Sequence, residues 1–289
     1  MKALGPYLYV APVAGFLLLF TYWPILFSFI LSFFRADLLS GQMTFVGIAN
    51  YSGLLRDPSF HNALRITVLF TLMTVPLRLA LALALAHVLR NESRFVRSLR
   101  GVYFLPYVTS SVAISVIWSW MFNTDMGVVN AALTTLGAGR VPWLQDPTAA
   151  LWAIAIVAIW KQLGYDILLY VAGLNAIPQE YYEAARIDGS SSWRIFTTIT
   201  WPLVAPTTLF LLIVSVIDSF QVFTIVNVMT LGGPAEGTNV LMNHLYYLSF
   251  ILFDISQGSA LAVILFLILA VVTAIKLAAT GRRVAYDLS

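Results

Sequence analysis

Six apolar runs, each long enough to cross a lipid bilayer, constrain this chain more than any other feature of its sequence. A membrane-spanning helix needs about 20 mostly apolar residues. The six runs cover residues 7–34, 62–89, 101–122, 150–173, 203–229 and 259–280. Within lipid, every backbone polar group must be satisfied inside the segment, so each continuous run is predicted to be one helix. The sequence therefore predicts an all-α integral membrane protein, with six transmembrane helices in a single domain over residues 1–289.

The low charge of the chain supports this class and excludes others. Only 10% of the residues are charged, whereas soluble domains carry roughly 25%. The chain contains no cysteine, which excludes disulfides and thiolate chemistry. Its three histidines are scattered, so we expect no metal site. The first apolar run is too long for a signal peptide, whose apolar region covers about 7–15 residues, and is expected to be a retained span.

Arginine and lysine residues are distributed unevenly among the connections between the runs. Cytoplasmic loops carry an excess of these residues. The richer side comprises the 90–100 connection, the 174–202 connection and the C-terminal tail, with Arg90, Arg94, Arg97, Arg100, Arg186, Arg194, Lys276, Arg282 and Arg283. The connections on the other side contain only Arg35, Arg56 and Arg140. We therefore expect both termini, and the loop between spans four and five, to face the cytoplasm.

That loop, "PQEYYEAARIDGSSSWRIFTTITWP" (178–202), is predicted to fold as a short helix, a turn and a second helix. Pro178 suits the first helical turn, and Glu180 and Glu183 favour the positive end of the helix dipole. Gly189 suits the end of the helix. One of the serines 190–192 is expected to cap the next helix, which the following prolines, Pro202 and Pro206, kink or delay.

The first helix of the loop is predicted to need a partner, because about ten residues are too few for a stable helix in water. Helices that lie on lipid headgroups favour Lys and Arg on the polar face, whereas this one carries acids. Docking to a cytoplasmic protein is therefore favoured over lipid binding. Ala184 and Ala185 are small enough to let a partner approach the middle of the helix.

The same residues resemble the EAA-loop pattern of binding-protein-dependent ABC importer permeases. Glu183-Ala184-Ala185 is followed by Gly189, Ile199 and Pro202 at the spacing of that pattern. One position departs, since Trp201 stands where the family usually has leucine. The stretches "FVGIANYSGLLRDPSFHNAL", "YFLPYVTSSVAISVIWSWMFN", "GVVNAALTTLG" and "TLGGPAEGTNVL" are similar to sugar-type permeases, and "WKQLGYDILLYVAGLNAIPQEYYEAARIDG" is similar to glycerol-3-phosphate permeases.

The resemblance implies the type I importer fold and a mechanism. The loop helix would be a coupling helix, with Glu183 and Gly189 as docking and turn positions supported by Ala184, Ala185 and Asp188. It implies a multi-pass protein of a bacterial or archaeal inner membrane. Its partners would be cytoplasmic ATPases that hold ATP and Mg²⁺, a second and different permease, and an extracytoplasmic binding protein that contacts the 123–149 and 230–243 loops.

The chain itself is not expected to be an enzyme. A phosphate-binding loop needs the pattern G-x-x-x-x-G-K-[S/T], and none of the three lysines, Lys2, Lys161 and Lys276, follows such a pattern. We therefore expect no cofactor on this chain, and ATP hydrolysis on a separate subunit.

Ionisable residues within membrane spans are costly and are functional candidates. Lys161, Asp218, Gln221 and Asn227 are expected to line the translocation pathway, the lysine because a cation would suit a phosphate or polyol. Helix–helix contact is an equally weighted interpretation for the polar groups of the fifth span. Arg78 and Asp166 are expected to form interhelical ion pairs that hold the bundle.

Two other classes of function explain the sequence less well than an importer permease does. A stand-alone channel or secondary transporter often shows internal repeats, and it gives no reason for the acidic loop helix. An intramembrane enzyme would need a metal-binding histidine pair or a nucleophile with a base. The substrate, a sugar or a polyol phosphate such as glycerol-3-phosphate, stays open at this point.

Overall fold

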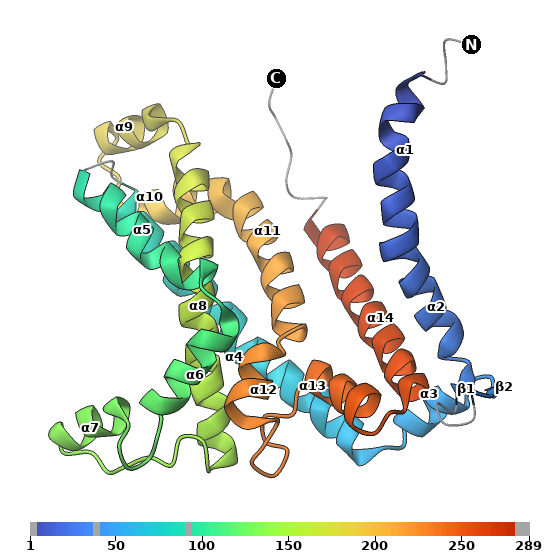
Figure 1. Cartoon of the computed structure of the whole chain (residues 1–289). Coiled ribbons are helices and arrows are strands. Elements are labelled where there is room, and N and C mark those ends of the chain that lie inside the picture. Colours follow the sequence, from blue (N-terminus) through green and yellow to red (C-terminus); the bar gives the residue numbers. More distant parts are fainter. Residues whose placement is uncertain (1–4, 37–40, 91–93, 281–289) are drawn as a thin grey trace. The chain divides into compact units, whose positions relative to one another are not determined.

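The computed structural model describes residues 5–36, 41–90 and 94–280 and is built almost entirely of helices (Figure 1). In this part of the chain, five helices are long and apolar enough to cross a membrane, or six if one bent pair counts as a single span. Four of them, Tyr9–Leu31, Pro58–Leu89, Pro147–Asn175 and Ile255–Ala278, match the predicted spans to within a few residues. The all-α membrane class is confirmed.

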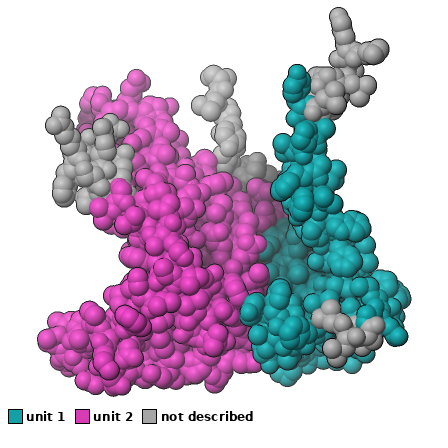
Figure 2. All heavy atoms as spheres, viewed as in Figure 1, with its two compact units in different colours: residues 1–61, 244–270 teal, residues 62–243, 271–289 magenta. Residues whose placement is uncertain are grey.

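The chain divides into two compact units, which are coloured separately in Figure 2. Unit 1 comprises Met1–His61 and His244–Ala270. It contains α1 (Gly5–Leu17), a π-helical turn (Leu18–Tyr22), α2 (Trp23–Leu31), α3 (Ala49–Leu54), the start of α4 and most of α14 (Ile255–Thr280). A hairpin of β1 (Phe34–Ala36) and β2 (Met43–Phe45) pairs Arg35 with Thr44. The first helical stretch ends earlier than predicted because Phe34–Ala36 enters this hairpin.

Unit 2 comprises Asn62–Asn243 and Val271–Ser289. Its helices are α4 (Pro58–Leu89), α5 (Arg94–Val108), α6 (Ser111–Met121), α7 (Val128–Thr135), α8 (Pro147–Asn175), α9 (Gln179–Ile187), α10 (Ser192–Ile195), α11 (Trp201–Phe220), α12 (Thr224–Thr230) and α13 (Leu241–Tyr246). A π-helical turn, Phe196–Thr200, joins α10 to α11. Helix α13 begins in unit 2 and ends in unit 1, where the π-helical turn Tyr247–Ile251 follows it.

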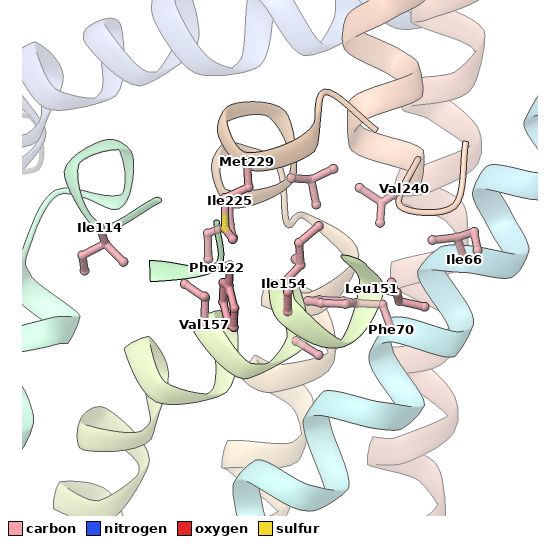
Figure 3. Close-up of a cluster of buried hydrophobic side chains, with 13 residues drawn as sticks. Ile66, Phe70, Ile114, Phe122, Leu151, Ile154, Val157, Ile225, Met229 and Val240 are labelled. Atoms are coloured by element: carbon pink, nitrogen blue, oxygen red, sulfur yellow. The ribbon is translucent and has the colours of Figure 1, made fainter. Parts of the chain in front are cut away.

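Helix α8 is the centre of unit 2, and it contributes to two apolar cores. In the first, Ile154 and Val157 of α8 pack with Phe70 of α4, Phe122 and Ile225 (Figure 3). In the second, Tyr170 and Leu174 of α8 pack with Leu79, Tyr182 and Val204. The second core extends from α4 and α11 to α9, so α9 belongs to the packed body of unit 2.

The prediction of one continuous helix over 101–122 is wrong. The segments Gly101–Val108 and Ser111–Met121 are bent by 103° at a short break. Ser110 has an extended backbone (φ −53°, ψ 127°), which stops one helix and begins the next. Pro106, four residues earlier, has no N–H to contribute to a helical hydrogen bond. The predicted fifth span lies within the candidate span Ser192–Thr230, in which α11 ends at Phe220 and α12 begins at Thr224.

Candidate functional site

Helix α9 is a nine-residue helix whose end is fixed by the backbone of Gly189. This glycine has φ +72°, a left-handed conformation that favours glycine. The N–H groups of Gly189 and Ser190 donate to the carbonyl oxygens of Arg186 and Ala185, both at 3.0 Å. These two bonds form a Schellman motif. The predicted turn role of Gly189 therefore agrees with the local geometry.

The chain after this turn follows the predicted order. The Ser191 hydroxyl caps α10 by accepting a hydrogen bond from the N–H of Arg194 at 3.4 Å. The helix then widens into the π-helical turn Phe196–Thr200, which ends two residues before Pro202. Proline cannot donate the helical hydrogen bond, so local widening is a common way to accommodate it. Helix α11 continues through Pro206 to Phe220.

Tyr182 anchors α9 to the rest of unit 2. Its side chain is 4% exposed, and its hydroxyl lies 3.3 Å from the Thr200 hydroxyl. The guanidinium of Arg90 lies over its ring, 5.1 Å from the centroid, at a distance typical of a cation–π contact. The sequence offers two adjacent tyrosines, Tyr181 and Tyr182, and does not tell which one faces inward.

The opposite face of α9 is exposed. Glu183 and Ala184 are exposed and Ala185 is half-buried. Tyr181 is 52% exposed and Ile187 is 87% exposed, and their spacing from Ala184 places all three on neighbouring positions of one face. This face has a small residue at its middle and larger apolar residues at both ends, and all three side chains are open to solvent.

A second feature of unit 2 is a polar cavity of about 260 Å³. Its lining includes Lys161, Asp218 and Gln221, three of the four predicted pathway residues. Asn227 is not among the lining residues, and its side-chain amide donates to Asn243 Oδ1 at 3.2 Å. The remaining polar side chains of the lining are Thr74, Arg78, Ser111, Gln162, Ser219 and Thr224.

The charged residues at this cavity differ in whether they have an ion-pair partner. Arg78 Nε lies 2.7 Å from Asp166 Oδ2, with the two side chains 7% and 1% exposed. Arg78 also donates to the Ser215 hydroxyl. Asp218 lies within electrostatic range of Arg78 and Asp166, and in the part of the chain that the structure describes it forms no ion pair. Among the described residues, Asp218 is therefore the acidic side chain at this cavity that has no ion-pair partner.

The Lys161 ammonium is fully used by backbone oxygens. It donates to the carbonyls of Pro106, Tyr107 and Thr109 at 3.3, 3.1 and 3.1 Å. These carbonyls lie at the break between α5 and α6. The sequence could not show these hydrogen bonds, because they depend on the break between α5 and α6. The apolar run 101–122 gives no sign of that break.

Comparison with known proteins identifies the family. Residues 77–285 match the family model described as "Binding-protein-dependent transport system inner membrane component". The chain belongs to the inner membrane permeases of binding-protein-dependent ABC importers. It is 37% identical to the sn-glycerol-3-phosphate transport system permease protein UgpA of Agrobacterium fabrum over 282 residues, covering 97% of this chain and 96% of the relative.

Other relatives of this permease carry different names. It is 34% identical to the trehalose/maltose transport system permease protein MalF of Thermococcus litoralis over 271 residues, covering 94% of this chain and 92% of the relative. Its fold matches a chain of a bacterial alginate ABC transporter solved in complex with alginate pentasaccharide-bound periplasmic protein, with a TM-score of 0.83 and 21% identity over 96% of this chain and 93% of that one. Permease subunits of this family are not enzymes.

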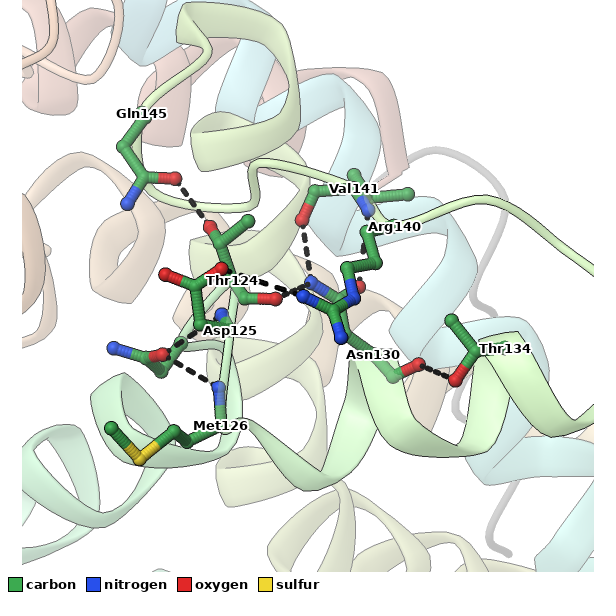
Figure 4. A network of polar contacts seen from close by, with 9 residues as sticks. Thr124, Asp125, Met126, Asn130, Thr134, Arg140, Val141 and Gln145 are labelled. Atoms are coloured by element: carbon green, nitrogen blue, oxygen red, sulfur yellow. Dashed lines mark hydrogen bonds and ion pairs between the residues drawn. The ribbon is translucent and has the colours of Figure 1, made fainter.

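The loop between α6 and α8 of the permease is rigidly organised around Asn130 (Figure 4). The Asn130 amide donates to the carbonyls of Thr124 and Val141 at 3.0 and 2.9 Å. Its oxygen accepts from the Val141 N–H and the Trp143 indole N–H, both at 3.1 Å. All four hydrogen-bonding positions of one buried side chain are satisfied, so α7 is held in a defined place. Sequence reasoning did not single out Asn130.

Some predictions fall outside the described residues. Arg282 and Arg283 lie beyond the last described residue, and the side chains of Arg94, Arg97 and Arg100 are not described either. Among the described residues, no group of three or more His, Asp or Glu side chains could hold a metal ion.

Proposed function

We propose that this permease imports a neutral carbohydrate by alternating access, driven through α9 by a separate cytoplasmic ATPase. The observation that carries the coupling role is the geometry of α9. Tyr182 and the Gly189 turn hold the helix rigidly, while Glu183, Ala184 and Asp188 stay exposed. A rigid, exposed helix can transmit movement of a bound partner to α8 and α11, with which it shares a core.

The remaining parts of the proposal follow from the family. The ATPase binds ATP with Mg²⁺ and supplies the energy, while a second, different permease completes the pathway. A binding protein delivers substrate to the 123–149 and 230–243 loops, and both termini lie in the cytoplasm. The name of the alginate transporter complex, which includes a ligand-bound periplasmic protein, supports this type of assembly.

The charge of the cavity supports a neutral substrate rich in hydroxyl groups. Arg78 is neutralised by Asp166, and the Lys161 N–H groups are occupied by carbonyls. What stays available is the Asp218 carboxylate, together with hydroxyl and amide groups such as those of Gln162 and Gln221. Carboxylates accept hydrogen bonds from sugar hydroxyls, whereas a phosphate beside a carboxylate is repelled.

A polyol phosphate is the second candidate, favoured by the UgpA relative at 37% identity. Uptake by cells that express the complete importer distinguishes the two, with radiolabelled maltose and sn-glycerol-3-phosphate as probes. We expect uptake of the neutral sugar. Replacing the carboxylate in Asp218→Asn is expected to lower that uptake roughly 12- to 140-fold, since a hydrogen bond to a charged group contributes about 1.5–3 kcal/mol. Uptake of glycerol phosphate alone would overturn the carbohydrate assignment.

The coupling role is tested by two substitutions in the complete importer. Glu183→Lys and Gly189→Val are expected to abolish uptake and to reduce co-purification of the ATPase, while the permease still reaches the membrane. Asp125→Lys and Gly137→Val are matched controls for co-purification of the ATPase, which they should leave unchanged; uptake is not compared for them, because their loop is assigned to the binding protein, and they alter an acid whose side chain is 80% exposed and a glycine with φ +79°. Both lie in the α6–α8 connection, away from α9 (Figure 1). Transport that continues without any ATPase would instead indicate a stand-alone channel or secondary transporter.

A further inference from the structure

The break between α5 and α6 places backbone carbonyls inside a membrane-spanning segment, where they need partners. The last carbonyls of a helix have no partner within the helix, and an unsatisfied carbonyl in lipid costs several kcal/mol. The Leu105 carbonyl accepts from the N–H and the hydroxyl of Thr109, at 3.2 and 2.8 Å. The carbonyls of Pro106, Tyr107 and Thr109 accept from Lys161.

The charge of Lys161 also suits its position. The C-terminal end of a helix carries roughly half a negative charge, and the ammonium of Lys161 meets the C-terminal carbonyls of α5. Hydrogen bonds from a charged donor are about twice as strong as neutral ones. An ammonium has three N–H donors and no acceptor. All three donors are matched here, so the side chain has no N–H left for a substrate anion.

Neighbouring residues of α8 hold the two half-helices on either side of Lys161. A Cβ at Gly164 would collide with the backbone of Tyr103, so α5 lies directly against α8 there. The rings of Tyr165 and Tyr107 stack with centroids 4.9 Å apart. On the α6 side, Trp118 and Trp160 meet edge to face with centroids 5.5 Å apart. Residues 160–165 of α8 thus contact both α5 and α6, the two helices of the bend.

The bend borders the polar cavity. Ser111, the first residue of α6, lines it together with Lys161 and Asp218. We infer that Lys161 is a positioning residue, which holds the third span in its broken form and so keeps this cavity open, and that it does not bind the charge of the substrate. The inference rests on the proposed function only in taking the cavity to be part of the substrate pathway. The geometry of the bend can be tested without any substrate.

Spin labels measure this geometry directly, since the chain has no native cysteine to interfere. Val102 and Val116, 66% and 45% exposed, are suitable positions for a pair of labelled cysteines in the complete importer. With a rise of 1.5 Å per residue, two arms bent by 103° place their Cα atoms ~13 Å apart, against ~21 Å in a straight helix. The two forms are distinguishable by continuous-wave and pulsed electron paramagnetic resonance.

In Lys161→Met we expect the label distances to lengthen and broaden toward the straight form. Lys161→Arg keeps the charge and the donors, and it is expected to restore the short distance. Ser110→Ala is the matched control at the bend, because the Ser110 side chain makes no capping hydrogen bond, and it should leave the distance unchanged. If Lys161→Met does not accumulate, Lys161→Gln, whose amide reaches less far, is expected to show the same lengthening.

A short, narrow distance in Lys161→Met or Lys161→Gln would overturn the inference. So would a lengthened distance in Lys161→Arg equal to that in Lys161→Met, because the contact would then not depend on charge and donors. A different result would overturn the proposed function, namely the absence of an ATPase from the purified importer. That result would not change the distances between the spin labels.

Discussion

The ion pair of Arg78 and Asp166 allows a quantitative prediction about the stability of the bundle. It joins α4 to α8 with a distance of 2.7 Å between Nε and Oδ2, and both side chains are nearly inaccessible. Removing one partner of a buried pair leaves an uncompensated charge and costs about 3–5 kcal/mol, or roughly 140- to 3,700-fold in the unfolding equilibrium.

Removing Arg78 and removing Asp166 should not lower the unfolding free energy by the same amount. Without its guanidinium, Arg78→Met leaves Asp166 unpaired and within electrostatic range of a second acidic residue, Asp218. Without its carboxylate, Asp166→Asn leaves Arg78 within range of Asp218 and bonded to Ser215. We therefore expect the unfolding free energy to fall by ~5 kcal/mol in Arg78→Met and by ~3 kcal/mol in Asp166→Asn.

The assay is reversible unfolding in mixed micelles with increasing sodium dodecyl sulfate, followed by far-ultraviolet circular dichroism. The double variant Arg78→Met with Asp166→Leu removes both charges, and it is expected to regain most of the lost stability, because apolar replacements of buried pairs are often neutral. A loss below ~1 kcal/mol in both single variants, the range of exposed ion pairs, would refute this reasoning. A larger loss for Asp166→Asn than for Arg78→Met would refute the role assigned to Asp218.

Two further predictions concern helix contacts in unit 2. Gly164→Ala adds a Cβ against the Tyr103 backbone and should cost about 1–3 kcal/mol by overpacking; an unchanged unfolding curve in the same micelle assay would contradict the close contact. Tyr182→Ala should cost about 3–5 kcal/mol and reduce ATPase co-purification, because it removes the anchor of α9. Tyr182→Phe, which loses only the hydroxyl, should keep most of both properties; equal loss in the two variants would show that the ring is not the anchor.

The positions of the spans and the α9 loop were predictable because they depend on local chemistry. Apolar length sets a span, and Gly189 is one of the few residue types that readily adopt the left-handed backbone that ends α9. The break at Ser110 was not predicted, although Pro106 and the Thr109-Ser110-Ser111 sequence were visible. Proline and serine are tolerated inside membrane helices, so those residues alone do not indicate a bend.

The partners of the intramembrane charges were not predictable from a single sequence. Arg78 and Asp166 lie on different helices, and their pairing depends on how α4 packs against α8. The use of Lys161 depends on the missed break. The sequence predicts Asn227 on the pathway with Asp218 and Gln221, yet its side chain contacts Asn243, because α11 ends before it.

The central claim, that α9 receives the movement of an ATPase, is tested most directly by site-specific cross-linking. The chain has no cysteine, so Ile187→Cys, at a position 87% exposed on α9, can carry a single benzophenone label. Met126→Cys, at a position 93% exposed in the α6–α8 connection, is the matched control. In the importer purified from membranes, the label at residue 187 should cross-link a subunit whose peptides contain a nucleotide-binding P-loop, and the label at residue 126 should not. Labelling of lipid alone at residue 187, or equal ATPase labelling at both positions, would contradict the coupling role of α9.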